Sequence, residues 1–229
     1  SRNLKLPDNG VLASTSEELR QTLHSYFNGS VEVLNEELTK NGLTELAAQS
    51  SLPIISLDRA YVDENTPHVV GYIDATRAVD EHYQDIGLKG RPGYPNLEDQ
   101  INLLRTDTVQ PVILLDDVIF GGGGVIELAE KLKQANRPVE AVFAGIGIKK
   151  GVDLIKESGI NVISVFEYDD VVDEVCERDF RAGIPMSGRS VFASDGEVYS
   201  APYFRPFGDA EKWASIPKEH ENDFSEICL

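Results

Sequence analysis

The 229-residue chain has little cysteine, few basic residues and no long apolar run. Its two cysteines, Cys176 and Cys228, match no zinc-ligand spacing, so we expect reduced thiols. No run of eighteen or more apolar residues occurs, which argues against a transmembrane helix. No basic stretch followed by an apolar stretch opens the chain, so we expect no secretory signal. These absences predict a cytoplasmic protein without a membrane partner.

The shortage of basic residues gives the chain a strongly acidic balance. There are 21 Lys and Arg against 39 Asp and Glu, a formal net charge of −18. Such a charge repels nucleic acid and anionic membrane surfaces, and we expect neither as a partner. It also repels an anionic substrate. A phosphate site here therefore needs local backbone N–H groups, a helix N-terminus, nearby cations or a metal ion.

A serine hydrolase site and a zinc site are not indicated by the sequence. Ser187 has no histidine in an evident triad order, since the four histidines are scattered. No His, Asp or Glu spacing is typical of a zinc site.

Apolar strands alternate with helices in the second half of the chain. The order predicts strands at 112–115, 139–148 and 160–166, and helices at 125–135, 152–158 and 171–180. Strands this apolar are typical of a parallel sheet covered by helices on both faces. We therefore predict an α/β fold with a doubly wound, mainly parallel sheet. We expect the chain to divide into a helical N-terminal segment (1–50), an α/β core (51–182) and an irregular C-terminal extension packed on the core (183–229).

The rest of the chain has a less regular pattern. A first helix is predicted to begin at Ser16, and Asn41-Gly42 to divide a second helical stretch. Further strands are predicted at 54–57 and 68–73, a long polar loop at 80–96, and a short helix at 97–105. Asp195-Gly196 indicates a hairpin in the C-terminal extension, where aromatic residues are expected to pack onto the core.

An acidic, glycine-rich turn follows the strand at 112–115. Asp116 and Asp117 come at the carboxyl end of this strand, where ligands bind in open α/β sheets. Sugar hydroxyls and Mg²⁺ are natural partners for two adjacent carboxylates. The four glycines 121–124 allow backbone N–H groups to approach an anion at the start of the next helix. The pattern favours a sugar-phosphate site, and a solvated turn or a response-regulator-like acidic pocket remain alternatives.

Residues 112–124 resemble the phosphoribosyl-pyrophosphate motif of the type I phosphoribosyltransferases, and the wider resemblance covers about residues 52–170. It implies that Asp116 and Asp117 are catalytic, contact the ribose hydroxyls and hold Mg²⁺ directly or indirectly. It implies that Phe120, Gly121, Gly122, Gly123 and Gly124 wrap the 5′-phosphate. The chain departs from the family by having glycine where the family has Thr or Ser. It also shows no pyrophosphate-binding loop within residues 1–50.

Further residues are candidates for substrate binding, those at 59–61 and 178–189 by the same resemblance and those at 89–91 by their place in the long polar loop. Arg59 and Tyr61 would face the pyrophosphate, with surface and packing roles as alternatives. Lys89 and Arg91 could close over the substrate from the long loop, or remain solvated. A basic and acidic group beyond the last strand could form the nucleobase site or a structural ion-pair network: Arg178, Asp179 and Arg189.

The resemblance implies transfer of a phosphoribosyl group from phosphoribosyl pyrophosphate to a nitrogenous base or amine, with Mg²⁺ as cofactor. The alternative is a non-catalytic sensor or regulatory module that binds a phosphoribosyl compound or nucleotide. A third hypothesis is an enzyme that uses another ribose phosphate. In each case the partner is a phosphorylated sugar or nucleotide. The oligomeric state stays open, a homodimer included.

Overall fold

The computed structural model describes residues 9–104, 110–181 and 187–229, which form two compact units. Residues 34–172 and 190–199 form the first, here called the α/β unit. The described residues of 1–33, 173–189 and 200–229 form the second, here called the terminal unit. The division at residues 50 and 182 suggested by the sequence stays a prediction.

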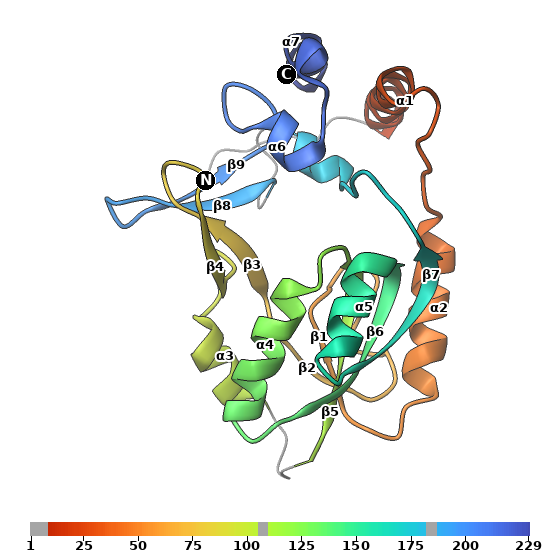
Figure 1. The fold of residues 1–229 in the computed structure, drawn as a ribbon, viewed down its shortest axis with the longest axis vertical. Helices are drawn as coiled ribbons and strands as arrows, with labels where there is room; N and C mark the ends of the chain where they lie inside the picture. The colour runs from red at the N-terminus through yellow and green to blue at the C-terminus, as the bar shows by residue number, and fades with distance from the viewer. Residues whose placement is uncertain (1–8, 105–109, 182–186) are drawn as a thin grey trace. The chain divides into compact units, whose positions relative to one another are not determined.

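Five parallel strands form the main sheet of the α/β unit (Figure 1). Their order across the sheet is β2-β1-β5-β6-β7. Their bounds are β1 (Ile54–Ser56), β2 (Val69–Tyr72), β5 (Val112–Ile119), β6 (Val139–Ile148) and β7 (Asn161–Tyr168). The predicted α/β fold with a mainly parallel sheet is confirmed.

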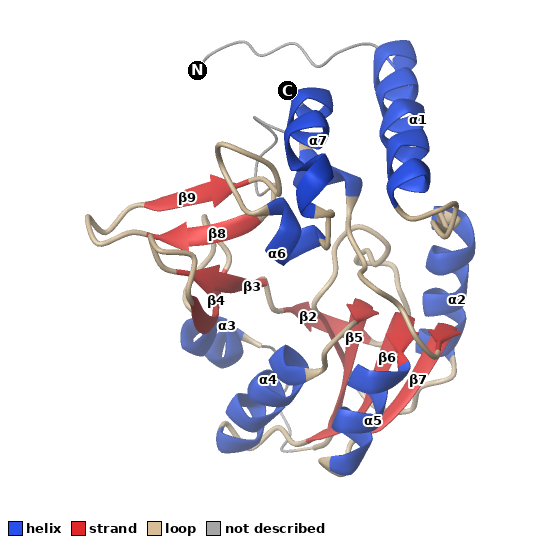
Figure 2. Ribbon diagram, turned by 45° about the horizontal axis from the view of Figure 1, so that its top comes forward, coloured by secondary structure: helices blue, strands red, loops and turns tan. Residues whose placement is uncertain are grey.

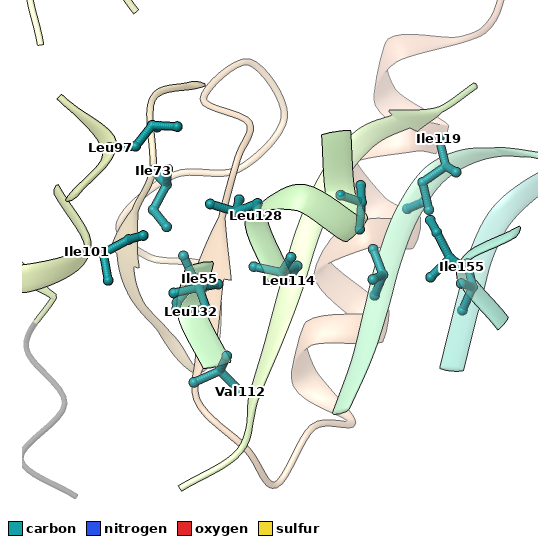
Figure 3. Packing of buried hydrophobic residues seen from close by; sticks show 14 of the residues in the cluster. Ile55, Ile73, Leu97, Ile101, Val112, Leu114, Ile119, Leu128, Leu132 and Ile155 are labelled. Atoms are coloured by element: carbon teal, nitrogen blue, oxygen red, sulfur yellow. The ribbon is translucent and has the colours of Figure 1, made fainter. Parts of the chain in front are cut away.

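Helices cover both faces of this sheet. On one face lie α3 (Leu97–Leu103), α4 (Gly123–Gln134) and α5 (Lys149–Glu157), whose apolar residues pack with Ile55 and Leu114 of the strands (Figure 3). On the other face, α2 (Glu36–Ala48) packs against Ile113 and Leu115. Alternate residues of β5 thus belong to two different cores, as the side-chain period of a strand requires. The sheet is doubly wound.

Helix α2 runs without a break through the predicted division at Asn41-Gly42, so that prediction is wrong. The helix begins where the Asn35 side chain accepts a hydrogen bond from the Leu38 N–H, 3.0 Å away. A Cβ at Gly42 would lie 2.5 Å from the side chain of Val165 on β7. Gly42 therefore brings the helix close to the sheet and does not end it.

A second, four-stranded sheet has the order β4-β3-β8-β9 (Figure 2). Its strands are β3 (Ala75–Val79), β4 (Asp85–Gly90), β8 (Arg189–Phe192) and β9 (Val198–Ala201). The predicted hairpin at Asp195-Gly196 is confirmed, with φ of +86° at Gly196. The predicted loop at 80–96 is wrong in part, because residues 85–90 pair with β3. The largely polar, glycine-containing sequence of this segment does not by itself favour a strand. The strand forms because the segment pairs with β3.

The terminal unit has its own apolar core. Leu19, Phe180, Phe204 and Phe224 are buried together, and the rings of Phe180 and Phe224 lie 5.1 Å apart in an edge-to-face contact. Its helical elements are α1 (Asn9–Tyr26), η1 (Glu177–Phe180), α6 (Ala210–Ala214), η2 (Lys218–His220) and α7 (Glu221–Cys228).

Two helix boundaries predicted in this part of the chain are wrong. Helix α1 begins at Asn9, so Ser16 lies inside it. Of the helix predicted at 171–180, only the short 3₁₀ turn η1 forms. The Asp173 carboxylate accepts a hydrogen bond from the Glu174 N–H at 2.9 Å, and such local side-chain-to-backbone bonds compete with a helix.

Candidate functional site

The strand order of the main sheet reverses between β1 and β5. From β1 the chain goes outward to β2, and it returns to the other side of β1 as β5, before continuing to β6 and β7. In open parallel sheets, ligands bind beyond the carboxyl ends of the strands at such a reversal. This edge carries the loop after β1 and the end of β5 with the glycine turn.

Asp116 and Asp117 lie inside β5 rather than after it, because the strand extends to Ile119. The pairing with β1 ends at Leu115, opposite Ser56, while the pairing with β6 continues. Both aspartates therefore lie just beyond the end of β1. The Asp117 N–H donates to Asp116 Oδ1 at 3.0 Å, and the Val118 N–H donates to Asp117 Oδ1 at 2.9 Å. The neighbouring strand stops early, which leaves this carboxylate pair at the reversal point.

Burial raises the pKa of both aspartates. For Asp116 the shift is large, and the charge of Asp117 adds to it. The pKa of Asp117 is raised by burial and then by the charge of Asp58. Within the described part of the chain, no Lys or Arg forms an ion pair with Asp116 or Asp117. Partly buried carboxylates without a cation favour a ligand that supplies hydroxyl donors or positive charge.

The glycine turn joins β5 to α4. Gly122 has φ of +74°, and a Cβ there would lie 2.7 Å from the carbonyl oxygen of Gly151. A Cβ at Gly151 would collide with the carbonyl oxygen of Phe120. The first hydrogen bond of α4 runs from the Ile126 N–H to the Gly122 carbonyl, at 3.1 Å. The N–H groups at 123–125 precede it and have no acceptor within the helix. They are suited to an anion.

The loop after β1 is organised by Asp58, which the sequence analysis did not identify. The carboxylate is buried and accepts hydrogen bonds from the N–H groups of Ala60, Tyr61 and Val62, at 2.9, 2.7 and 3.1 Å. Three backbone N–H groups of the loop therefore donate to the Asp58 carboxylate of the loop itself and not to a ligand. The signal was available, since Asp58 follows the predicted strand at 54–57 in the same way as the pair at 116–117 follows the predicted strand at 112–115.

Arg59 is held by Asp74. Its guanidinium makes two hydrogen bonds to the Asp74 carboxylate, at 2.7 and 2.8 Å, and lies 4.1 Å from the centre of the Tyr72 ring. Asp74 is buried, with a side chain 9% exposed. Tyr61 is half-buried against the core on the α2 face. The contacts give Arg59 a structural partner, and its predicted role in substrate binding stays a proposal.

We expect Arg59→Ala to lower the free energy of unfolding by about 1–3 kcal/mol, because it leaves the buried Asp74 carboxylate without its cation. Affinity for ribose 5-phosphate should change less than twofold. Urea unfolding and calorimetric titration measure the two effects. In an Asp74→Asn background the same change should cost much less stability. A loss of ligand affinity at unchanged stability would instead assign Arg59 to the ligand.

Lys89 and Arg91 lie on and just after β4. Lys89 pairs with Thr76, whereas the neighbouring pair is Arg77 with Leu88, so Lys89 points to the opposite face of the hairpin from Arg77. Arg91 donates from Nη2 to the Ala75 carbonyl at 3.2 Å. Their binding roles stay predictions.

The remaining candidates belong to the terminal unit, whereas residues 116–124 belong to the α/β unit. Asp179 accepts a hydrogen bond from the Gly188 N–H at 2.8 Å, and Arg178 Nε lies 3.8 Å from the same carboxylate. The Arg189 guanidinium lies 5.1 Å from the centre of the Trp213 ring. These contacts suit a structural network. The predicted nucleobase role of Arg178, Asp179 and Arg189 stays untested.

Two further observations concern metals and membranes. Across residues 9–104, 110–181 and 187–229, no group of three or more His, Cys, Asp or Glu side chains is placed to hold a metal ion. None of the helices in these ranges is long and apolar enough to cross a membrane.

Comparison with known proteins finds similarity to phosphoribosyltransferases. No family model matches the chain. Orotate phosphoribosyltransferase of Listeria monocytogenes is 28% identical over 79 residues, which are 34% of this chain and 38% of that protein. Its counterpart in Listeria innocua is 24% identical over 92 residues, 39% of this chain and 44% of that protein. The chain thus spans about two-fifths of the length of these relatives. The resemblance predicted from the sequence is confirmed.

Similar solved structures carry related names. Orotate phosphoribosyltransferase from Aeropyrum pernix has 16% identity and a TM-score of 0.36, over 57% of this chain and 69% of that one. Adenine phosphoribosyltransferase from Thermoanaerobacter pseudethanolicus has 14% identity and a TM-score of 0.37, over 58% of this chain and 79% of that one.

Proposed function

We propose that the chain is a phosphoribosyltransferase-like enzyme that binds a ribose 5-phosphate group at residues 116–124. The observation that carries this proposal is the carboxylate pair beyond the end of β1, followed at once by a glycine turn and the free N–H groups of α4. Carboxylates accept hydrogen bonds from vicinal hydroxyls, and the N–H groups at a helix N-terminus donate hydrogen bonds to a phosphate. The sequence similarity to orotate phosphoribosyltransferases agrees with this ligand.

The proposed reaction transfers the phosphoribosyl group from phosphoribosyl pyrophosphate to a nitrogenous base or amine. Asp116 and Asp117 would accept hydrogen bonds from the ribose hydroxyls and thus fix the sugar. Residues 120–124 would hold the 5′-phosphate through the backbone. Fixing both ends of the ribose orients C1 toward the incoming nitrogen. The negative charge of the carboxylate pair would also stabilise positive charge that develops on the sugar in the transition state.

A magnesium ion fits Asp116 and Asp117 as an ion that the protein would share with the substrate. Among the described residues no cation forms an ion pair with the two carboxylates, and burial, followed by the charge of a neighbouring aspartate, raises the pKa of each. Mg²⁺ prefers six oxygen ligands and usually keeps water and substrate oxygens. With no cluster of three or more ligating side chains among the described residues, Asp116 and Asp117 would hold it together with substrate oxygens, directly or through water. When bound, the ion would offset charge on the pyrophosphate.

The other expectations remain part of the proposal. They are a small phosphorylated sugar or nucleotide as partner, no nucleic-acid or membrane partner, and a cytoplasmic location. A homodimer stays open.

The test is a calorimetric titration with phosphoribosyl pyrophosphate and Mg²⁺, compared with ribose 5-phosphate. We expect both to bind, and the pyrophosphate compound to bind at least about tenfold more tightly, since it adds charged contacts. Pyrophosphate release upon addition of orotate, adenine or another base then measures transfer. Absence of binding by both ligands would refute the proposed function.

A second candidate function is a non-catalytic sensor of ribose 5-phosphate compounds, and the loop after β1 favours it. The Asp58 carboxylate accepts hydrogen bonds from three backbone N–H groups, which are therefore not available to bind an anion at this edge. Its charge also acts on Asp116 and Asp117, so a pyrophosphate group nearby would meet further negative charge. Equal affinity for phosphoribosyl pyrophosphate and ribose 5-phosphate would support the sensor. Asp58→Asn keeps a hydrogen-bond acceptor but removes the charge, and should then raise affinity for the pyrophosphate compound alone.

A further inference from the structure

The glycine turn has no hydroxyl side chain to offer a phosphate. Positions 121–124 are all glycine, so the turn itself supplies only backbone donors. The formal net charge of the chain is −18, which opposes binding of a dianion. A cation brought to the turn by another element would therefore contribute much of the affinity.

The β3–β4 hairpin brings such an element to the turn (Figure 1). Arg77 and Leu88 are directly paired across the hairpin, so their side chains share one face. Leu88 Cδ1 lies 3.7 Å from the position of a Cβ on Gly124, and Arg77 Nη2 lies 3.9 Å from that of a Cβ on Gly121. The Leu88 N–H also donates to Glu127 Oε2 of α4, at 3.2 Å. The hairpin is thus bonded to the same helix whose N-terminus the turn forms.

The Arg77 guanidinium has no hydrogen-bond or ion-pair partner in the part of the chain that the structure describes. Two other arginines on nearby segments have partners: Arg59 binds the Asp74 carboxylate, and Arg91 Nη2 donates to the Ala75 carbonyl. A guanidinium offers five donors in a planar array that matches phosphate.

We propose that Arg77 is a substrate-binding residue that holds the phosphate of the ligand over the glycine turn. This inference rests on the proposed function, and it assigns to the β3–β4 hairpin the side-chain contact that the turn lacks. Backbone N–H groups of the start of α4 bind the phosphate from one side. The Arg77 guanidinium binds it from the side of Gly121.

Calorimetric titration of ribose 5-phosphate tests the assignment. Arg77→Ala should weaken binding at least about tenfold, because a charge-assisted contact is lost. Arg77→Lys keeps the charge without the planar array, and its loss should be intermediate. Lys133→Ala is the matched control: it removes the same charge from the last turn of α4, where Lys133 is exposed near Glu130, and should leave affinity unchanged. Circular dichroism should show equal thermal unfolding for the three variants and the wild type.

The outcomes separate the two proposals. If Asp116→Asn/Asp117→Asn abolishes binding while Arg77→Ala binds like the wild type, the site stands and the role of Arg77 is refuted. A loss in Lys133→Ala as large as in Arg77→Ala would also refute it, since general charge would then explain the effect. If the wild type does not bind ribose 5-phosphate, the proposed function fails and the role of Arg77 fails with it.

Discussion

Replacing both Asp116 and Asp117 by asparagine is expected to weaken binding of ribose 5-phosphate by about a hundredfold or more, because each carboxylate loses charge-assisted hydrogen bonds to the sugar. Asparagine has nearly the same shape, so the loss reports charge and not packing. Calorimetric titration of the wild type and the double variant measures it. Glu130→Gln, an exposed change on α4, is the control and should bind like the wild type.

The same variant should be more stable than the wild type in the absence of ligand. Burial raises the pKa of both carboxyls above their ordinary value of 3.8. From about that value up to the raised pKa values, the folded chain holds more protons than the unfolded chain. Wild-type stability therefore falls as the pH rises through this window. Asparagine cannot ionise, so the double variant should lack this part of the decline.

Thermal unfolding between pH 4 and pH 8 measures this effect. In a chain of this size, each kcal/mol by which the double variant is more stable than the wild type should raise its Tm by about 2–4 °C. A gain in stability together with a loss of binding would show that the pair is retained for its ligand. If the double variant were less stable than the wild type at pH 7 to 8, the aspartates would be structural, and their assignment to the ligand would fall.

Gly151→Ala is expected to lower the free energy of unfolding by about 3 kcal/mol and to weaken ligand binding as well, because a Cβ there collides with the Phe120 carbonyl. Gly122→Ala should act similarly, since it adds strain at φ of +74° and a contact of 2.7 Å with the Gly151 carbonyl. Chemical unfolding gives the stability change. Titration at a temperature where the variants remain folded gives the affinity.

Gly123→Ala is the matched control for stability. A Cβ at Gly123 has nothing within 4 Å, and the residue begins α4, so alanine should keep or raise stability by up to about 1 kcal/mol. If Gly151→Ala proved as stable as Gly123→Ala, the close approach of the two backbones would not shape the turn.

The regular part of the α/β unit could be predicted from the sequence because its signals are local. The apolar run at 112–115 and the periodic residues of 125–135 each specify one element without reference to the rest of the chain. The acidic pair and the glycines lie next to one another in the same stretch, so the candidate site was visible as well. The strand itself continues four residues further, because β6 is long enough to pair with it.

The β3–β4 hairpin could not be predicted in this way. Its strands mix apolar and polar residues, with two glycines in β4. They form strands only because β3 and β4 pair with each other and β3 pairs with β8, more than a hundred residues later. Arg77 consequently had no predicted position. The partner of Arg59 was hidden for the same reason, since Asp74 follows fifteen residues later on another segment.

The sequence by itself determined the order of strands and helices from β5 to β7 and the chemistry of the turn at 116–124. Both depend on residues that are neighbours in the chain. Only the tertiary structure decided three further features. The pairing of β5 with β1 ends just before Asp116, the Asp58 carboxylate accepts hydrogen bonds from N–H groups of its own loop, and Arg77 lies near Gly121. These depend on strand register and on contacts between distant segments, which hydrophobic period and propensity do not specify.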